Sequence, residues 1–302
     1  MTTAKNFPSS RLLLAAGALV LAACQPAASP DAPESAPEPA AEAPVEAKTR
    51  HFRVTGSIRK LKNEGRIAVI DHDEIPGYME RMVMPFHARD TAVFAAVKPG
   101  DRVIFDYYVS DSDAWVENVT VTGSGPAPAP DDATVETPVL KAGDAMPDRS
   151  FVDQEGRPRR LSEFRGKTVA LTFIFTRCPA PDFCPKMMRH FAETATLLAD
   201  GPDDWHLLTV SFDPETDTPA VLKAFGQAYG QDPARWTLLV GDTDTTAAIA
   251  RDVGLRYGRA EPQGPYQHNL RTVVLRPDGT VAKLFLDEDW TPADLAAAMR
   301  AK

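Results

Sequence analysis

The sequence predicts two folded domains, a small all-β domain followed by a larger α/β domain. The first contains short runs in which polar and apolar residues alternate, and the second contains apolar runs interleaved with amphipathic helical segments. Proline-rich segments precede and separate the two domains. The 302 residues, 43% hydrophobic and 25% charged, exclude a disordered chain and a polytopic membrane protein. The formal net charge of −9 argues against a nucleic-acid partner.

The small domain has the pattern of a compact β-structure. A strand is predicted at 67–70, and a turn at 99–101 leads into strict period-two alternation over 103–109. A further alternating segment covers 115–121. Several short strands within about 70 residues predict a small barrel.

The larger domain alternates strands and helices. The apolar run 168–175 is typical of a buried parallel strand. The other predicted elements are a helix at 185–199, a strand at 205–212, a helix capped by Thr218-Pro219, strands near 236–240, 270–275 and 280–286, and a final helix capped at Thr291. A βαβ chain that ends in a hairpin and a helix has the element order of a thioredoxin-like domain.

The N-terminus resembles an export signal. Lys5 and Arg11 precede the apolar run Leu12–Ala23, which is too short for a comfortable membrane span. The run ends in Leu-Ala-Ala-Cys24, which resembles the bacterial lipobox, and this resemblance implies that Cys24 is lipidated. An ordinary secretory signal is the alternative. Both interpretations export the chain to an oxidising compartment.

Composition gives the domain boundaries. We expect a lipoprotein signal peptide at 1–23, the lipidated Cys24 with a Pro/Ala-rich tether over 24–48, the β-barrel at 49–122, a linker at 123–137 and the thioredoxin-like domain at 138–302.

Two cysteines follow the first strand of the larger domain. Cys178 lies in the loop after that strand, and Cys184 precedes Pro185 at the predicted start of a helix. Because a helix N-terminus favours negative charge, we expect a lowered thiol pKa there. Thiolates act as nucleophiles, disulfide partners and soft metal ligands. A redox-active pair, a structural disulfide and a metal site therefore all remain open for Cys178 and Cys184.

A histidine supplies a third ligand. His268 immediately precedes the strand 270–275, at a position that faces the loop after the first strand in this fold. Two thiolates and one imidazole form a soft, low-coordinate set that suits copper, as Cu(I) or Cu(II), better than magnesium or calcium.

These motifs resemble the Sco/SenC family of copper chaperones and thiol oxidoreductases. They are FTRCPAPDFCP at 175–185, VSFDPETDTP at 210–219, His268, and the turn 277–279. The resemblance implies that Cys178, Cys184 and His268 bind one copper ion. It also implies copper delivery to, or thiol reduction of, the binuclear copper site of cytochrome c oxidase. The expected partners are the oxidase subunit that holds this site, other copper carriers and thiol reductants. The family usually has three residues between its cysteines, and this chain has five.

A methionine cluster lies in the small domain. Met82 and Met84 share a strand face, Met79 comes from the preceding turn, and His72 ends the previous strand. Thioethers hold Cu(I) and form no disulfides. The segment resembles the CusF-like periplasmic copper-binding family, an OB-type barrel, which implies that His72, Met82 and Met84 are copper ligands. Where characterised members have a copper-capping tryptophan, this chain has Met79, with Tyr78 beside it. Met79 is then a third thioether ligand, or Tyr78 takes the aromatic role.

The leading hypothesis is a copper chaperone, anchored by lipid on the periplasmic side of a bacterial membrane. In it the methionine site captures Cu(I), and the cysteine–histidine site accepts it and passes it on. The second hypothesis is an enzyme, a thiol–disulfide oxidoreductase. The third is a copper-tolerance buffer without a delivery partner.

Overall fold

The computed structural model describes residues 49–126, 140–259, 266–286 and 290–301. The predicted signal peptide, Cys24 and the tether lie outside the described residues, as does most of the predicted linker. Residues Glu46–Lys302 form one compact unit.

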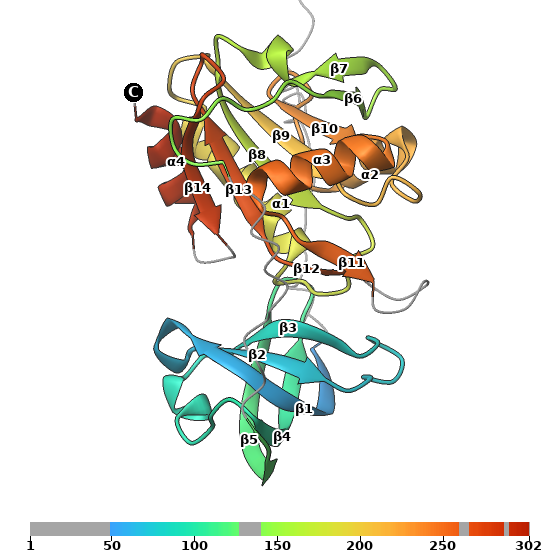
Figure 1. The fold of residues 1–302 in the computed structure, drawn as a ribbon, viewed down its shortest axis with the longest axis vertical. Helices are drawn as coiled ribbons and strands as arrows, with labels where there is room; N and C mark the ends of the chain where they lie inside the picture. Colours follow the sequence, from blue (N-terminus) through green and yellow to red (C-terminus); the bar gives the residue numbers. More distant parts are fainter. Residues whose placement is uncertain (1–48, 127–139, 260–265, 287–289, 302) are drawn as a thin grey trace, which may run out of the picture. The chain divides into compact units, whose positions relative to one another are not determined.

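The all-β part is a five-stranded antiparallel sheet, here called the β-domain (Figure 1). Its strand order is β3-β2-β1-β4-β5, and its strands are β1 (Arg50–Lys62), β2 (Ile67–His72), β3 (Met82–His87), β4 (Asp101–Val109) and β5 (Ala114–Ser124). The predicted alternation over 103–109 is confirmed as β4, and β5 covers the predicted 115–121. Within the described residues, the edges of the sheet meet at an isolated bridge between Ala88 and Val116 rather than in a continuous ladder.

The longest strand of the β-domain, β1, was not predicted from the sequence. The central strand β1 pairs with both β2 and β4. Its inward positions Val54, Gly56 and Ile58 do follow period two, and Val54 and Ile58 are buried. The signal was therefore present, although interspersed basic residues weakened it.

The second part, here called the α/β domain, is built on a seven-stranded sheet of order β14-β13-β8-β9-β10-β6-β7. Its strands are β6 (Ser150–Asp153), β7 (Pro158–Arg160), β8 (Thr168–Ile174), β9 (Trp205–Ser211), β10 (Trp236–Val240), β13 (Arg271–Leu275) and β14 (Val281–Leu286). β8, β9 and β10 are parallel, and β13 runs antiparallel to β8 and forms a hairpin with β14. This is the predicted thioredoxin-like architecture.

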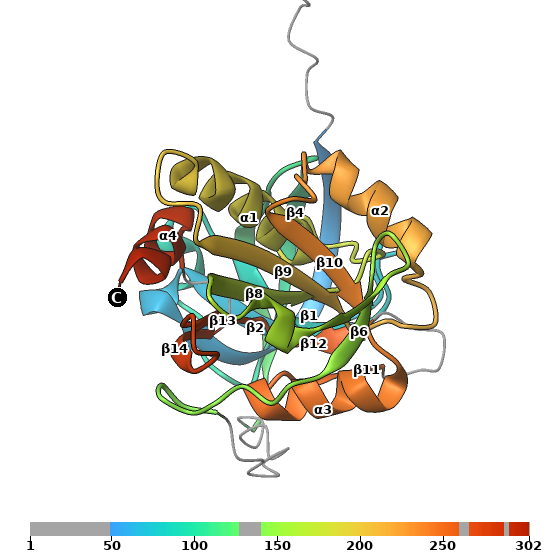
Figure 2. The ribbon, with the colours of Figure 1, turned by 90° about the horizontal axis from the view of Figure 1, so that it is seen from above.

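Four helices cover this sheet. They are α1 (Cys184–Leu198), α2 (Pro219–Ala228), α3 (Thr243–Val253) and α4 (Pro292–Arg300). Figure 2 shows α1, α2 and α4 on one face of the sheet and α3 on the opposite face. The predicted caps are confirmed: the Thr218 hydroxyl accepts from the Val221 N–H, and Thr291 and Asp294 form a capping box.

Several elements of the α/β domain were not predicted. The edge strands β6 and β7, which pair with each other, precede the first predicted strand. Helix α3 is capped by Asp242 and ends at the left-handed Gly254. A small hairpin is formed by β11 (Tyr257–Arg259) and β12 (Tyr266–His268). This last hairpin carries His268 and belongs to neither large sheet, so its position depends on contacts with the rest of the domain.

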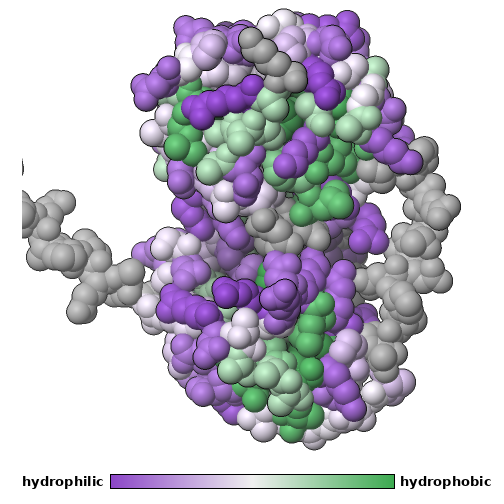
Figure 3. Space-filling view, turned by 90° about the vertical axis from the view of Figure 1, so that its left-hand side faces the viewer, coloured by the Kyte–Doolittle hydropathy of each residue, from purple (hydrophilic) through white to green (hydrophobic). Residues whose placement is uncertain are grey.

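The described surface carries few large apolar side chains. The exposed ones are Val121, Val152, Leu197, Val221 and Leu286, which come from five different elements. Figure 3 shows one face on which hydrophilic residues surround smaller hydrophobic areas. Among the described residues, no helix is long and apolar enough to cross a membrane.

Candidate metal centre

The cysteine loop, residues 175–183, joins β8 to α1. Cys178 is half-buried in this loop, and Cys184 is the first residue of α1 and fully buried. The backbone N–H and the hydroxyl of Thr176 both donate to the buried carboxylate of Asp217. This anchor fixes the chain two residues before Cys178.

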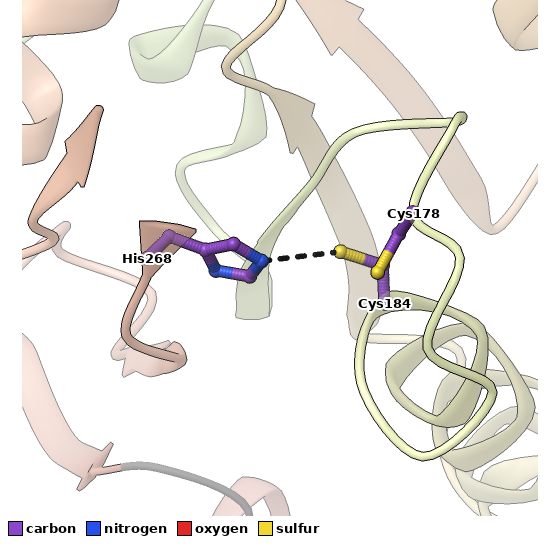
Figure 4. A group of neighbouring side chains, drawn as sticks. All are labelled: Cys178, Cys184 and His268. Atoms are coloured by element: carbon purple, nitrogen blue, oxygen red, sulfur yellow. Dashed lines mark hydrogen bonds between the residues drawn. The ribbon is translucent and has the colours of Figure 1, made fainter. Parts of the chain in front are cut away.

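His268 approaches the two cysteines from β12 (Figure 4). Its Nδ1 lies 3.0 Å from the carbonyl oxygen of Asn269. A carbonyl oxygen only accepts, so Nδ1 donates to it and Nε2 is the ring nitrogen that faces the sulfur atoms. That Nε2 lies 3.7 Å from the Cys184 Sγ. The Asn269 hydrogen bond therefore orients the ring so that Nε2 can bind a metal ion through its lone pair or, when it carries a proton, donate to a thiolate.

The structure brings the three predicted ligands of this domain together. The ligand atoms of Cys178, Cys184 and His268 all lie within 4.8 Å of one another. Among the described residues, they form the one group of three or more His, Cys, Asp or Glu side chains compact enough to hold a metal ion. Both cysteines are free thiols here. The five intervening residues thus leave the sulfur atoms close enough to share one ion.

The two thiols differ in acidity. Burial opposes ionisation of Cys178, but hydrogen bonds with Cys184 and His268 outweigh it and lower the pKa of Cys178 to about 5. Burial, together with the neighbouring Cys178, raises the pKa of the Cys184 thiol well above its ordinary value. The expectation that the helix N-terminus would favour a thiolate at Cys184 is wrong, because desolvation and the adjacent sulfur oppose a second charge.

Aromatic rings enclose the histidine. The His268 ring centre lies 4.8 Å from that of Phe212, 5.1 Å from that of Phe183 and 5.7 Å from that of Phe175. Phe175 and Phe183 belong to the cysteine loop, and Phe212 directly follows β9, so two chain segments restrict the imidazole.

Asp213, which lies within the VSFDPETDTP motif, ties the cysteine loop to the histidine hairpin. Its fully buried carboxylate accepts from Arg177 at 3.1 Å, from Arg259 at 3.2 Å and from the Tyr266 hydroxyl at 3.4 Å. Arg177 is next to Cys178, and Arg259 and Tyr266 belong to the hairpin that ends at His268. Asp213 is therefore a positioning residue, and only the VSFDPETDTP motif hinted at it.

The methionine cluster also assembles on one face. His72 pairs with Met82 across β2 and β3, and Ile70 pairs with Met84, so His72, Met82 and Met84 share a side of the sheet. All three are buried. The His72 Nδ1 lies 2.7 Å from the Asp73 carbonyl oxygen, while its buried Nε2 has no hydrogen-bond partner. A buried lone pair beside two thioethers fits a soft metal ion.

Met79 and Tyr78 take different positions. Met79 is buried and forms a β-bridge with Ile75, which brings its side chain into the same core. Tyr78 stacks on Phe52 at 4.8 Å, and its hydroxyl donates to the carbonyl oxygen of Pro179 at 3.0 Å. Tyr78 therefore contacts the cysteine loop.

Comparison with known proteins places these features in a family. Residues 140–302, more than half of the chain, match the family model described as SCO1/SenC. The chain belongs to the SCO1/SenC family. Residues 51–121 match the model described as copper binding periplasmic protein CusF, so a CusF-like domain precedes the SCO1/SenC domain. Both resemblances inferred from the sequence are thereby confirmed.

Individual relatives cover the SCO1/SenC domain. A SCO1 protein homolog of Bacillus subtilis is 29% identical over 150 residues, which are 48% of this chain and 75% of the relative. A mitochondrial SCO2 homolog of Mus musculus is 30% identical over 139 residues, 44% of this chain and about half (52%) of its own length. The crystal structure of a SCO1/SenC family lipoprotein from Bacillus anthracis aligns with a TM-score of 0.48 and 24% identity, covering 54% of this chain and 97% of that one.

Proposed function

We propose that this chain is a copper chaperone that works outside the cytoplasm and supplies copper to the binuclear copper site of cytochrome c oxidase. The observation that carries the proposal is the convergence of two thiols and an imidazole within 4.8 Å. Two sulfur ligands and one nitrogen ligand select copper over hard cations. The low pKa of Cys178 means that one thiolate is available at neutral pH.

Delivery is a ligand exchange. Copper would be held by Cys178, Cys184 and His268, with Cys178 as the ionised sulfur. A cysteine thiolate of the acceptor forms a new bond to the ion as a bond to Cys178 breaks, and the oxidation state of copper does not change. Cys178 is half-buried whereas Cys184 is fully buried. An acceptor would therefore approach from the side of Cys178.

The β-domain would hold a second copper ion through His72, Met82 and Met84, with Met79 as a further thioether. The orphaned Nε2 of His72 supports this assignment, because a buried polar atom without a partner costs free energy unless a ligand satisfies it. Thioethers suit Cu(I) in an oxidising compartment because they do not form disulfides. A copper-tolerance buffer without a delivery partner would use this same site.

Location outside the cytoplasm rests on the N-terminal sequence. The lipobox pattern would make Cys24 a lipidated anchor on the periplasmic side of a bacterial membrane. Labelling with a radioactive fatty acid tests this. We expect label on the wild-type chain and none on Cys24→Ser.

A thiol–disulfide oxidoreductase is the second candidate, and the split in thiol acidity favours it. The Cys178 thiolate would attack a substrate disulfide, and Cys184 would then displace the mixed disulfide. This step reduces the substrate to two thiols and oxidises the pair to a Cys178–Cys184 disulfide, which a thiol reductant must reduce again.

Anaerobic Cu(I) titration against a competing chelator tests the chaperone function. We expect the wild-type chain to bind two equivalents of Cu(I). The variant Cys178→Ser and the double variant Met82→Leu/Met84→Leu should each bind one equivalent. No binding by the wild type would refute the proposal. His268→Ala separates the two candidates, because a chaperone loses copper at this site whereas an oxidoreductase keeps its thiol exchange. Normal oxidase copper in a copper-sensitive deletion strain would favour the buffer.

A further inference from the structure

The methionines of the β-domain and the ligands of the SCO1/SenC domain line one small cavity. Its lining includes Met82 and Met84 of β3 and Cys178 and His268 of the SCO1/SenC domain. The cavity measures about 10 Å³, close to the smallest space that holds a single water-sized species. Both domains lie within the compact unit Glu46–Lys302. The cavity therefore joins two sets of soft ligands with room for one ion.

The walls of the cavity are mostly apolar. Phe175 and Phe183 of the cysteine loop contribute rings, and β3 adds Val83 between the two methionines. The described residues of the lining include Tyr266 but no carboxylate of the kind that hard cations prefer. Residues that carry thioether, thiol and imidazole donors therefore border the same small space.

Polar contacts hold the two domains together around the cysteine loop. Besides the Tyr78 hydrogen bond to Pro179, the His87 Nε2 lies 3.6 Å from a carboxylate oxygen of Asp182. Arg189 of α1 donates to the carbonyl oxygens of both Pro181 (2.8 Å) and Ser112 (2.9 Å). Ser112 belongs to the turn between β4 and β5. Three contacts thus fix the loop that carries Cys178 against the β-domain.

We propose that Cu(I) passes within one molecule from the methionine site to the cysteine–histidine site through this shared cavity. The inference rests on the proposed chaperone function and adds the route by which its copper site is filled. Bonds from copper to the Met82 and Met84 thioether sulfurs break as bonds to the cysteine sulfurs and the His268 Nε2 form. Any proton still on a ligating cysteine leaves to solvent. No electron is transferred.

The direction and the rate follow from ligand chemistry. Thiolates are charged and bind Cu(I) more strongly than neutral thioethers, so the equilibrium favours the cysteine–histidine site. The two ligand sets share a molecule, which converts transfer into an intramolecular step with a high effective concentration. The ion also remains coordinated throughout, since both sets reach the same cavity. The pathway needs no free copper.

A competition between two full-length chains tests the route. The first is wild type with its cysteines oxidised to a disulfide, loaded anaerobically with one equivalent of Cu(I). The second is an equal amount of reduced, copper-free, heavy-isotope-labelled Met82→Leu/Met84→Leu. Leucine nearly preserves the side-chain volume, so this acceptor chain retains its core. A phosphine reductant starts the transfer. Native mass spectrometry identifies the chain that holds copper, and the ultraviolet absorption of copper–thiolate bonds reports arrival at the cysteines.

We expect early copper–thiolate species on the originally loaded chain in about tenfold or greater excess over the labelled chain. An equal division between the two chains would overturn the intramolecular route while leaving the chaperone function intact. Failure of the oxidised chain to retain one equivalent of Cu(I) would also overturn it, because the donor site would be absent. Copper that reaches the cysteines of neither chain would overturn the chaperone function itself.

A second comparison tests the domain contact. Tyr78→Phe removes the hydroxyl that donates to Pro179 but keeps the ring stacked on Phe52. We expect it to reduce the excess several-fold. Tyr108→Phe is the matched control, because Tyr108 stacks on Trp115 and neither residue lines the cavity. It should retain the full excess. An unchanged excess in Tyr78→Phe would overturn the role of this contact in the transfer.

Discussion

The acidity of Cys178 gives a direct test of the site geometry. Its pKa lies near 5 against an ordinary value of 9.0, because hydrogen bonds with Cys184 and His268 favour the thiolate despite burial. At pH 7 a thiol with pKa 5 is about 99% ionised, whereas one with pKa 9 is about 1% ionised. Alkylation of Cys178 by iodoacetamide should therefore rise through a midpoint near pH 5. It should be lost as the pH falls below that midpoint, where the thiolate is protonated.

The perturbation is His268→Ala, which removes one of the two hydrogen-bond partners of the thiolate. We expect the alkylation midpoint of Cys178 to move upward by about one pH unit or more. Site-specific rates are measured by mass spectrometry of the alkylated peptides in the copper-free, reduced chain. Cys184 should react slowly across the range, since it is fully buried and its pKa is raised.

His190→Ala is the control for this experiment. His190 lies on α1 and packs its ring against Trp290 at 5.0 Å, so its removal leaves the thiol hydrogen bonds in place. The midpoint should stay near pH 5. A wild-type midpoint of 8 to 9, typical of a free thiol, would refute the reasoning, as would a midpoint that His268→Ala leaves unchanged.

Three further changes probe the supporting structure. Asp213→Asn removes the buried negative charge that holds two arginines, and should cost about 2 kcal/mol in urea unfolding and weaken Cu(I) binding at the cysteine site. His72→Phe should abolish the methionine-site copper in a chelator titration while costing about 1 kcal/mol or less, since only one ring nitrogen has a hydrogen-bond partner. Gly56→Ala places a Cβ 2.6 Å from the Ile70 side chain and should lower the free energy of unfolding by about 2 kcal/mol, measured by urea denaturation. In the control Gly123→Ala the nearest atom to the new Cβ is 3.9 Å away, so stability should not change. Equal urea midpoints for the two variants would contradict the packing argument.

Local signals in the sequence determined much of the fold. The period-two run of β4, the apolar run of β8 and the caps at Thr218 and Thr291 are patterns within a few residues, and the structure has each of them. The candidate ligands were equally visible, because cysteine, histidine and methionine in such clusters are chemically distinctive. The CusF-like and SCO1/SenC resemblances could be recognised for the same reason.

Some elements were missed. Helix α3 was one of them although local signal was present, because its buried residues 246, 249, 250 and 253 follow helical spacing between the Asp242 cap and Gly254. The hairpin of β11 and β12 is held by Asp213 from a segment more than forty residues away. No local pattern specifies such a contact.

Tertiary structure alone decided how the ligands act. The helix N-terminus suggested a thiolate at Cys184, yet burial and the neighbouring sulfur reverse that preference and leave Cys178 as the acidic thiol. The meeting of Met82 and Met84 with Cys178 and His268 around one cavity was likewise outside the reach of sequence reasoning. Ligand identity is a property of single residues, whereas acidity and proximity depend on which distant groups the fold packs around them.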